Sequence, residues 1–175
     1  MFLLDYIRQR WQPRGSVVSA GVPPQQRPAA IVLPPDLVAR HLCACDDLPH
    51  DAASQAAIAE AISDPAAIQH GAREIARRLI AADRVAAELE ALTRLIGVLL
   101  AELARHMYIS AARERPGAIG IRLMEEPGIS DPAVAQLLEQ DAYGLGPGVY
   151  PFDHVPANPT PGKRCGFYIR VVTTP

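Results

Sequence analysis

The sequence predicts a mainly α-helical protein with one long, coiled-coil-like central helix in an oligomeric bundle, an extended proline-rich N-terminal arm and a small β element near the C-terminus. Three observations lead to this fold class. Apolar residues recur at alternating steps of three and four over residues 72–107, no proline lies between Pro65 and Pro116, and prolines punctuate residues 12–35. A 3.5-residue apolar repeat is typical of helices that pack lengthwise on one another.

Composition places the chain among globular proteins. Of its 175 residues 49% are hydrophobic and 21% charged, which fits one domain or a small domain with extensions. The net charge of −2 gives no attraction to nucleic acid or to an anionic membrane, so we expect neither as a partner. The three cysteines do not form a disulfide framework, which predicts synthesis in a reducing compartment, the cytoplasm.

Residues 1–50 are expected to form a short helix, an extended arm and a second short helix. The first helix covers residues 2–11 and stops before Pro13. The arm covers residues 12–35, where each residue before a proline is driven toward extended geometry. The second helix begins near Asp36. Such an arm lies across a surface, of its own chain or of a neighbour.

Residues 51–115 are expected to form a helical domain. Asp51 can cap a helix over residues 52–62. Asp64 and Pro65 then supply a cap residue and a proline at the first helical position, so a long helix is predicted over residues 65–115.

Residues 116–175 are expected to form a loop-rich α+β region. Residues 118–124 alternate like a strand, Asp131 can cap a helix over residues 132–142, and residues 165–173 are rich in β-branched and aromatic side chains. The two strands are expected to pair in a small sheet.

The length of the central helix predicts partners. A helix of ~45–50 residues is about 70 Å long, whereas a compact globule of this chain length is roughly 40 Å across. Either the helix folds back near Gly97, or other chains cover its apolar stripe. No polar loop residues surround Gly97, so partners in trans are favoured. The predicted oligomer interface consists of Ile75, Leu79, Ala82, Ala86, Leu89, Ile96, Leu100, Leu103 and Met107.

One local cluster has metal-ligand chemistry. His41, Cys43, Cys45 and His50 offer two imidazoles and two thiols, the donor types that zinc prefers. However, the C-x-C spacing differs from common zinc knuckles, so a zinc site is only the alternative. The sequence contains no recognisable catalytic motif, and no catalytic or cofactor-binding residue is predicted.

These features predict a non-enzymatic structural subunit of a multi-chain particle, such as a bacteriophage head, neck or tail component, that oligomerises through residues 72–107. Its partners would be copies of itself and other subunits, and it would enter a virion or other large particle after synthesis. The alternatives are a zinc-binding module or small enzyme that uses the 41–50 cluster, and a helical adaptor that docks on one dissimilar partner.

Overall fold

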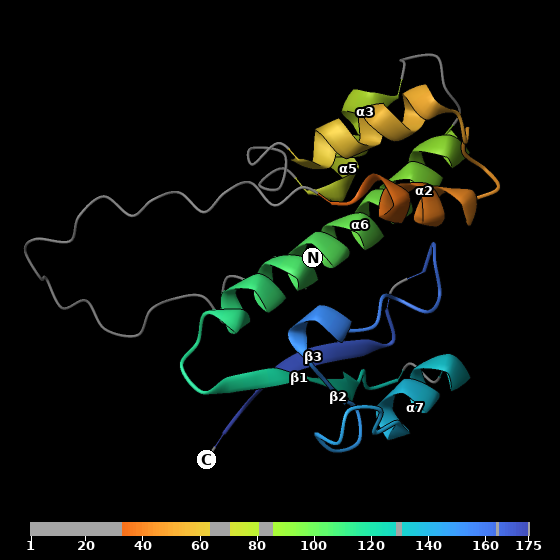
Figure 1. The fold of residues 1–175 in the computed structure, drawn as a ribbon. Coiled ribbons are helices and arrows are strands. Elements are labelled where there is room, and N and C mark those ends of the chain that lie inside the picture. The colour runs from red at the N-terminus through yellow and green to blue at the C-terminus, as the bar shows by residue number, and fades with distance from the viewer. Residues whose placement is uncertain (1–32, 64–70, 81–85, 129–130, 164, 175) are drawn as a thin grey trace, which may run out of the picture.

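The computed structural model describes residues 33–63, 71–80, 86–128, 131–163 and 165–174 (Figure 1). In this part of the chain, helices are the main elements and a small antiparallel sheet lies near the C-terminus, which confirms the mainly α class with a minor β element. The elements are α2 (Pro35–Cys43), α3 (Ala52–Ser63), α5 (Ala72–Leu79), α6 (Ala86–Arg113), β1 (Ala118–Glu125), α7 (Pro132–Glu139), β2 (Val149–Tyr150), the 3₁₀ helix η1 (Phe152–His154) and β3 (Phe167–Thr173).

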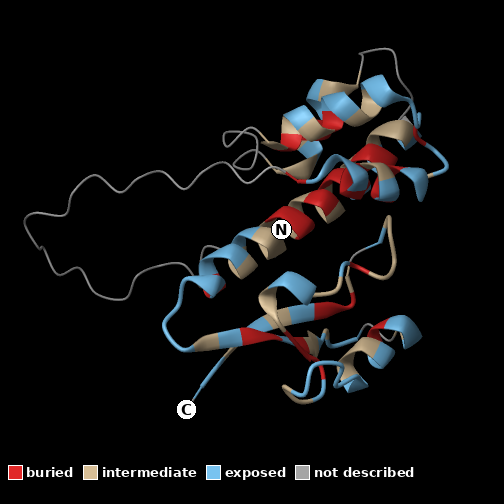
Figure 2. Cartoon of the chain, in the orientation of Figure 1, coloured by how far each residue is buried: buried red, intermediate tan, exposed pale blue. Residues whose placement is uncertain are grey.

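The helical half packs α2, α3 and α5 around the N-terminal part of α6 (Figure 1). Leu95, Ile96 and Leu99 of α6 have no measurable exposure and lie at the centre of this core, seen as the buried stretch of the helix in Figure 2. Burial of such side chains is worth about 1.5–3 kcal/mol each, so this core is the main source of stability in the helical half.

The prediction of one continuous helix over residues 65–115 is wrong. Helix α5 ends at Leu79, Ile80 has extended backbone angles (φ −90°, ψ 129°), and α6 begins at Ala86. Helix α5 packs back along α6: a Cβ atom built on Gly97 would lie 3.9 Å from Cβ of Ala72. The chain therefore reverses between the two helices, and not at Gly97 as the fold-back alternative supposed.

Several local predictions are confirmed. Helix α2 includes Asp36, and α3 begins after Asp51, whose carboxylate accepts a hydrogen bond from the Ser54 amide as a capping residue does. Asp131 caps α7 in the same way through the amide of Ala133. Helix α7 ends at Glu139, three residues before the predicted end.

The predicted strand pairing is also confirmed, and a short third strand was missed. The sheet has the order β2–β1–β3 and is antiparallel throughout. Gly120 of β1 approaches β2 so closely that a Cβ on it would lie 2.5 Å from the Tyr150 carbonyl oxygen, a contact that only glycine allows. Two-residue β2 has no sequence pattern long enough to predict it.

The register of the sheet gives it two different faces. Ile121 opposite Val171 and Leu123 opposite Ile169 pack in a second core with α6 and α7. The alternate positions of β1 and β3 point away from this core.

Some expectations lie outside the described residues. These are the helix over residues 2–11, most of the arm over residues 12–35, and the first residues of the predicted long helix, 65–70. The domain boundaries after residues 50 and 115 remain predictions.

Helix α6 is long and apolar enough to cross a membrane by length and composition alone. Its best 18-residue window, within Ala87–Arg113, has a mean hydropathy of 1.3. A mostly buried core helix of a soluble protein passes the same test, and 39% of this window is buried inside the structure. The expectation of no membrane partner stays a prediction.

Candidate functional site

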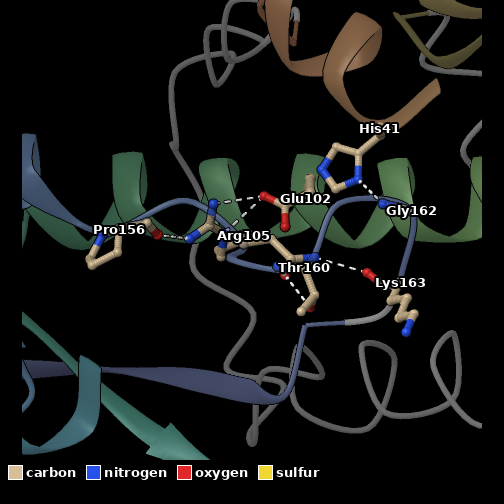
Figure 3. A network of polar contacts seen from close by, with 8 residues as sticks. His41, Glu102, Arg105, Pro156, Thr160, Gly162 and Lys163 are labelled. Carbon is tan, nitrogen blue, oxygen red and sulfur yellow. Dashed lines mark hydrogen bonds and ion pairs between the residues drawn. The ribbon is translucent and has the colours of Figure 1, made fainter. Parts of the chain in front are cut away.

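A group of buried polar side chains lies where the helical half meets the segment that leads into β3 (Figure 3). His41 of α2 has no exposed surface, and Glu102 of α6 and Asn158 are each 2% exposed. Together with Arg105 of α6, we call these residues the polar junction. Because burying polar groups is costly unless they are paired, their partners indicate what the junction does.

Arg105 and Glu102 form a buried ion pair one helical turn apart on α6. The Arg105 guanidinium donates to Glu102 Oε2 through Nε at 3.1 Å and through Nη2 at 2.7 Å. Its Nη1 donates to the carbonyl oxygen of Pro156. One side chain thus neutralises a buried carboxylate and holds a segment 51 residues further along the chain.

His41 attaches the same segment from the other side. Its Nδ1 accepts a hydrogen bond from the Gly162 amide at 3.0 Å, so in the neutral ring the proton resides on Nε2. That Nε2 atom is buried and has no hydrogen-bond partner in the described part of the chain. In Figure 3 the ring lies beside the Glu102 carboxylate. Burial lowers the pKa of His41 against the opposing effect of the Glu102 charge, while Arg40 and Arg105 lower it further.

Asn158 closes the segment on itself. Its amide nitrogen donates to the Lys163 carbonyl oxygen, and its Oδ1 accepts from the backbone and hydroxyl of Thr160. These hydrogen bonds stabilise the fold of residues 156–163 against α2 and α6. The hydrogen-bond partners of the polar junction therefore belong to the same chain.

Cys165 lies near the junction but is poorly suited to nucleophilic chemistry. Burial raises the pKa of its thiol to about 11, although the charge of Arg105 acts in the opposite direction. The thiol therefore stays protonated near neutral pH, whereas a catalytic cysteine requires the thiolate.

The four predicted zinc ligands do not form one site. His41 points to Gly162, Cys45 Sγ donates to the His41 carbonyl oxygen, His50 donates to the Cys45 carbonyl oxygen, and Cys43 is exposed. Among the described residues, no group of three or more His, Cys, Asp or Glu side chains is placed to hold a metal ion. The ligand set of the zinc alternative is therefore not assembled.

The predicted oligomer interface is mostly covered by its own chain. Ile75, Ile96 and Leu103 are buried in the helical core by residues of the same chain. Their place in an oligomer interface stays a prediction. Leu79, Leu89 and Leu100 pack partly against the same core, and Met107 remains 45% exposed. The side chains of Ala82 and Ala86 lie outside the part of the chain that the structure describes.

The helical half also contains a small, partly open pocket of about 200 Å³. Apolar residues such as Leu42, Ile58 and Leu92 line it, with Ser54 and Glu88 as polar neighbours. Ligand pockets usually measure about 300–1,000 Å³, so this cavity is small for a substrate site.

Within the described residues, no helix or strand covers the face of the sheet turned away from α6, although the loop at Leu145 and Gly146 lies beside it. Sequence patterns did not reveal this face. Arg122 and Met124 of β1 lie directly opposite Arg170 and Tyr168 of β3. Both arginines are exposed, and Tyr168 is 42% exposed. We call these four residues the open sheet face. Alternation alone indicates which residues share a face within each strand, but the cross-strand pairs require the register.

No protein-family model, curated protein or solved structure matches this chain. Its function is therefore inferred from the geometry described above.

Proposed function

We propose that the chain is a non-enzymatic assembly subunit that binds further copies of itself in a multi-chain particle, of which a virion component is one example. Its contacts would include the sheet half and the adjoining end of α6, and would not run along the whole 72–107 stripe. The observation that carries this proposal is the uncovered apolar surface of this part. Met107, Ile119, Tyr143 and Tyr168 are each 38–45% exposed.

The distribution of exposure supports this location. The stripe that first suggested assembly is largely buried by α2, α3 and α5. In contrast, no helix or strand of the described residues is packed on the open sheet face in Figure 1, although the loop at Leu145 and Gly146 lies beside it. The face combines an aromatic side chain with two arginines. Tyrosine and arginine are enriched at protein–protein interfaces.

The chemistry of the buried polar groups supports a non-enzymatic role. A catalytic group must reach a substrate, whereas Arg105, Glu102 and Asn158 bind the fold itself. The Cys165 thiol, with its raised pKa, is held in its unreactive form.

Light scattering coupled to size separation tests the proposal on the full chain, from micromolar to near-millimolar concentration. We expect a mass that rises with concentration to a multiple of 18.8 kDa. Tyr168→Ser should weaken this association, whereas Arg73→Ser on the exposed surface of α5 should leave it unchanged. A mass of 18.8 kDa at every concentration would contradict self-assembly and favour the adaptor alternative.

A further inference from the structure

We propose that the open sheet face of one copy docks on the Asp46–Asp47 loop of the next copy, so that copies join head to tail. This inference rests on the proposed self-assembly and names the two surfaces that meet. Four observations carry it: paired arginines, their apolar neighbours, a matching pair of carboxylates, and the separate locations of the two surfaces.

The arginines form an unfavourable pair within the chain. Arg122 and Arg170 are cross-strand neighbours on the same face, and both are exposed. In the described part of the chain neither guanidinium has an ion-pair partner. Like charges directly opposite each other destabilise a sheet. An anionic group bound between them would remove this repulsion.

The neighbours of the arginines favour a protein as the occupant. Half-buried Met124 and exposed Tyr168 form the adjacent cross-strand pair and provide apolar surface beside the two charges. A free anion would contact only the two guanidinium groups and would leave the apolar surface of Met124 and Tyr168 exposed to water. Two-fold pairing of two open sheet faces would bring four guanidinium groups together, so the occupant must be a different, acidic surface.

The connection between α2 and α3 has the complementary charges. Asp46 and Asp47 are consecutive and exposed. Their Cα atoms are about 3.8 Å apart, close to the spacing of roughly 4.5–5.5 Å between residues opposite each other on antiparallel strands. Two carboxylates can therefore meet two guanidinium groups one to one, in the bidentate geometry that arginine favours. Exposed Pro49 follows and can contact Tyr168.

Asp47 can leave its present ion-pair partner, Arg94, with little loss of free energy. Its carboxylate lies 4.0 Å from the Arg94 guanidinium, and the two side chains are 73% and 70% exposed. Exposed ion pairs at this distance contribute about 0–1 kcal/mol. The intermolecular pair would be shielded from water by Tyr168 and Met124, which strengthens it.

The two surfaces lie on different parts of the molecule. The Asp46–Asp47 loop follows α2 in the helical half, whereas the open sheet face lies beyond α6 in the other half (Figure 1). Contacts between different surfaces of identical subunits propagate, and they produce a ring where the rotation closes and a filament where it does not.

Charge reversal tests this docking on the full chain. The face variant carries Arg122→Glu and Arg170→Glu, and the loop variant carries Asp46→Arg and Asp47→Arg. Each variant presents two like-charged surfaces to itself, so we expect its association constant to fall at least tenfold. A one-to-one mixture of the two variants restores both opposite-charge contacts and should recover the wild-type mass by light scattering. Arg40→Glu with Arg73→Glu is the matched control for the face variant, because it makes the same charge change at other exposed positions.

The outcomes separate this inference from the proposed function. If wild type assembles and both variants assemble equally well, the docking surfaces are wrong and self-assembly stands. The same conclusion follows if the folded variants, checked by circular dichroism, lose assembly but fail to recover it in the mixture. If wild type remains at 18.8 kDa, both proposals are overturned.

Discussion

A buried guanidinium and carboxylate, Arg105 and Glu102, connect the helical half of the chain to the segment that leads into β3. Replacing Arg105 by Met would leave the Glu102 charge buried and unpaired, and the Pro156 carbonyl without its donor. We expect a loss of about 3–5 kcal/mol in the free energy of unfolding, measured by denaturant titration.

The double variant Arg105→Met with Glu102→Leu is the control for this prediction. Replacing a buried ion pair by apolar groups of similar size is often close to neutral, so the double variant should recover most of the loss. A loss below about 1 kcal/mol for Arg105→Met alone would mean that water reaches the pair.

His41 makes stability depend on pH. Burial lowers its folded-state pKa below the ordinary value of 6.5, so the unfolded chain binds its proton first as the pH falls. A protonated Nδ1 can no longer accept from the Gly162 amide. The contribution of His41 is therefore complete above pH 6.5 and decreases below it. We expect the free energy of unfolding, measured by denaturant titration, to fall as the pH drops from 7 toward 5.

Two substitutions isolate His41 from other groups, including His106, whose pKa burial also lowers. His41→Asn keeps an acceptor near the Nδ1 position without titrating, and it should flatten the pH dependence below 6.5. His50→Asn, at an exposed position, should leave it unchanged. Equal slopes for wild type and His41→Asn would show that the junction does not respond to pH.

At the scale of elements, α5 and α6 form an antiparallel pair that touches at Gly97 and Ala72. A Cβ added at Gly97 would lie 3.9 Å from the Ala72 Cβ, an ordinary contact, so Gly97→Ala fits and should stabilise α6 by up to about 1 kcal/mol. Gly97→Leu adds bulk against α5 and should cost about 1–3 kcal/mol. Thermal unfolding of the two variants checks this, and equal midpoints would argue against the close packing.

Local sequence signals predicted the elements that depend on local chemistry. Asp51 and Asp131 cap helices that begin where expected, and the alternation in residues 118–124 marks β1. The break after Leu79 has no such signal, because residues 80–86 contain neither Pro nor Gly, and alanine and arginine favour helix. Packing of α5 on α6, and not local propensity, accounts for this reversal.

Sequence patterns also could not predict the polar junction. The spacing of Glu102 and His106 indicates an ordinary polar pair on one helix face, whereas the partner of Glu102 is Arg105. The remaining contacts join α6 to Pro156 and α2 to Gly162, which are 51 and 121 residues apart in sequence. Periodicity indicates neighbours within one element, and it carries no information on such distant pairs.

At the scale of the whole molecule, the chain covers most of its own apolar stripe. In one continuous helix the stripe would extend along about 70 Å. Because the chain reverses between α5 and α6, the apolar residues of α5 instead pack on those of α6. Within the described residues, the sheet face and the end of α6 around Met107 remain exposed. The proposed assembly therefore depends on these exposed surfaces, and not on the buried part of the stripe.

An engineered disulfide between residues 72 and 97 tests this self-coverage most directly. In a background with Cys43→Ser, Cys45→Ala and Cys165→Ala, the variant Ala72→Cys with Gly97→Cys is oxidised, and its mass and free thiols are measured under denaturing conditions. The Cβ separation of 3.9 Å suits a disulfide, whose mean is about 3.8 Å, whereas a continuous helix would hold the positions about 37 Å apart. We predict a disulfide within one chain at 18.8 kDa. Free thiols, or disulfide-linked dimers, would contradict the reversal and the self-coverage that follows from it.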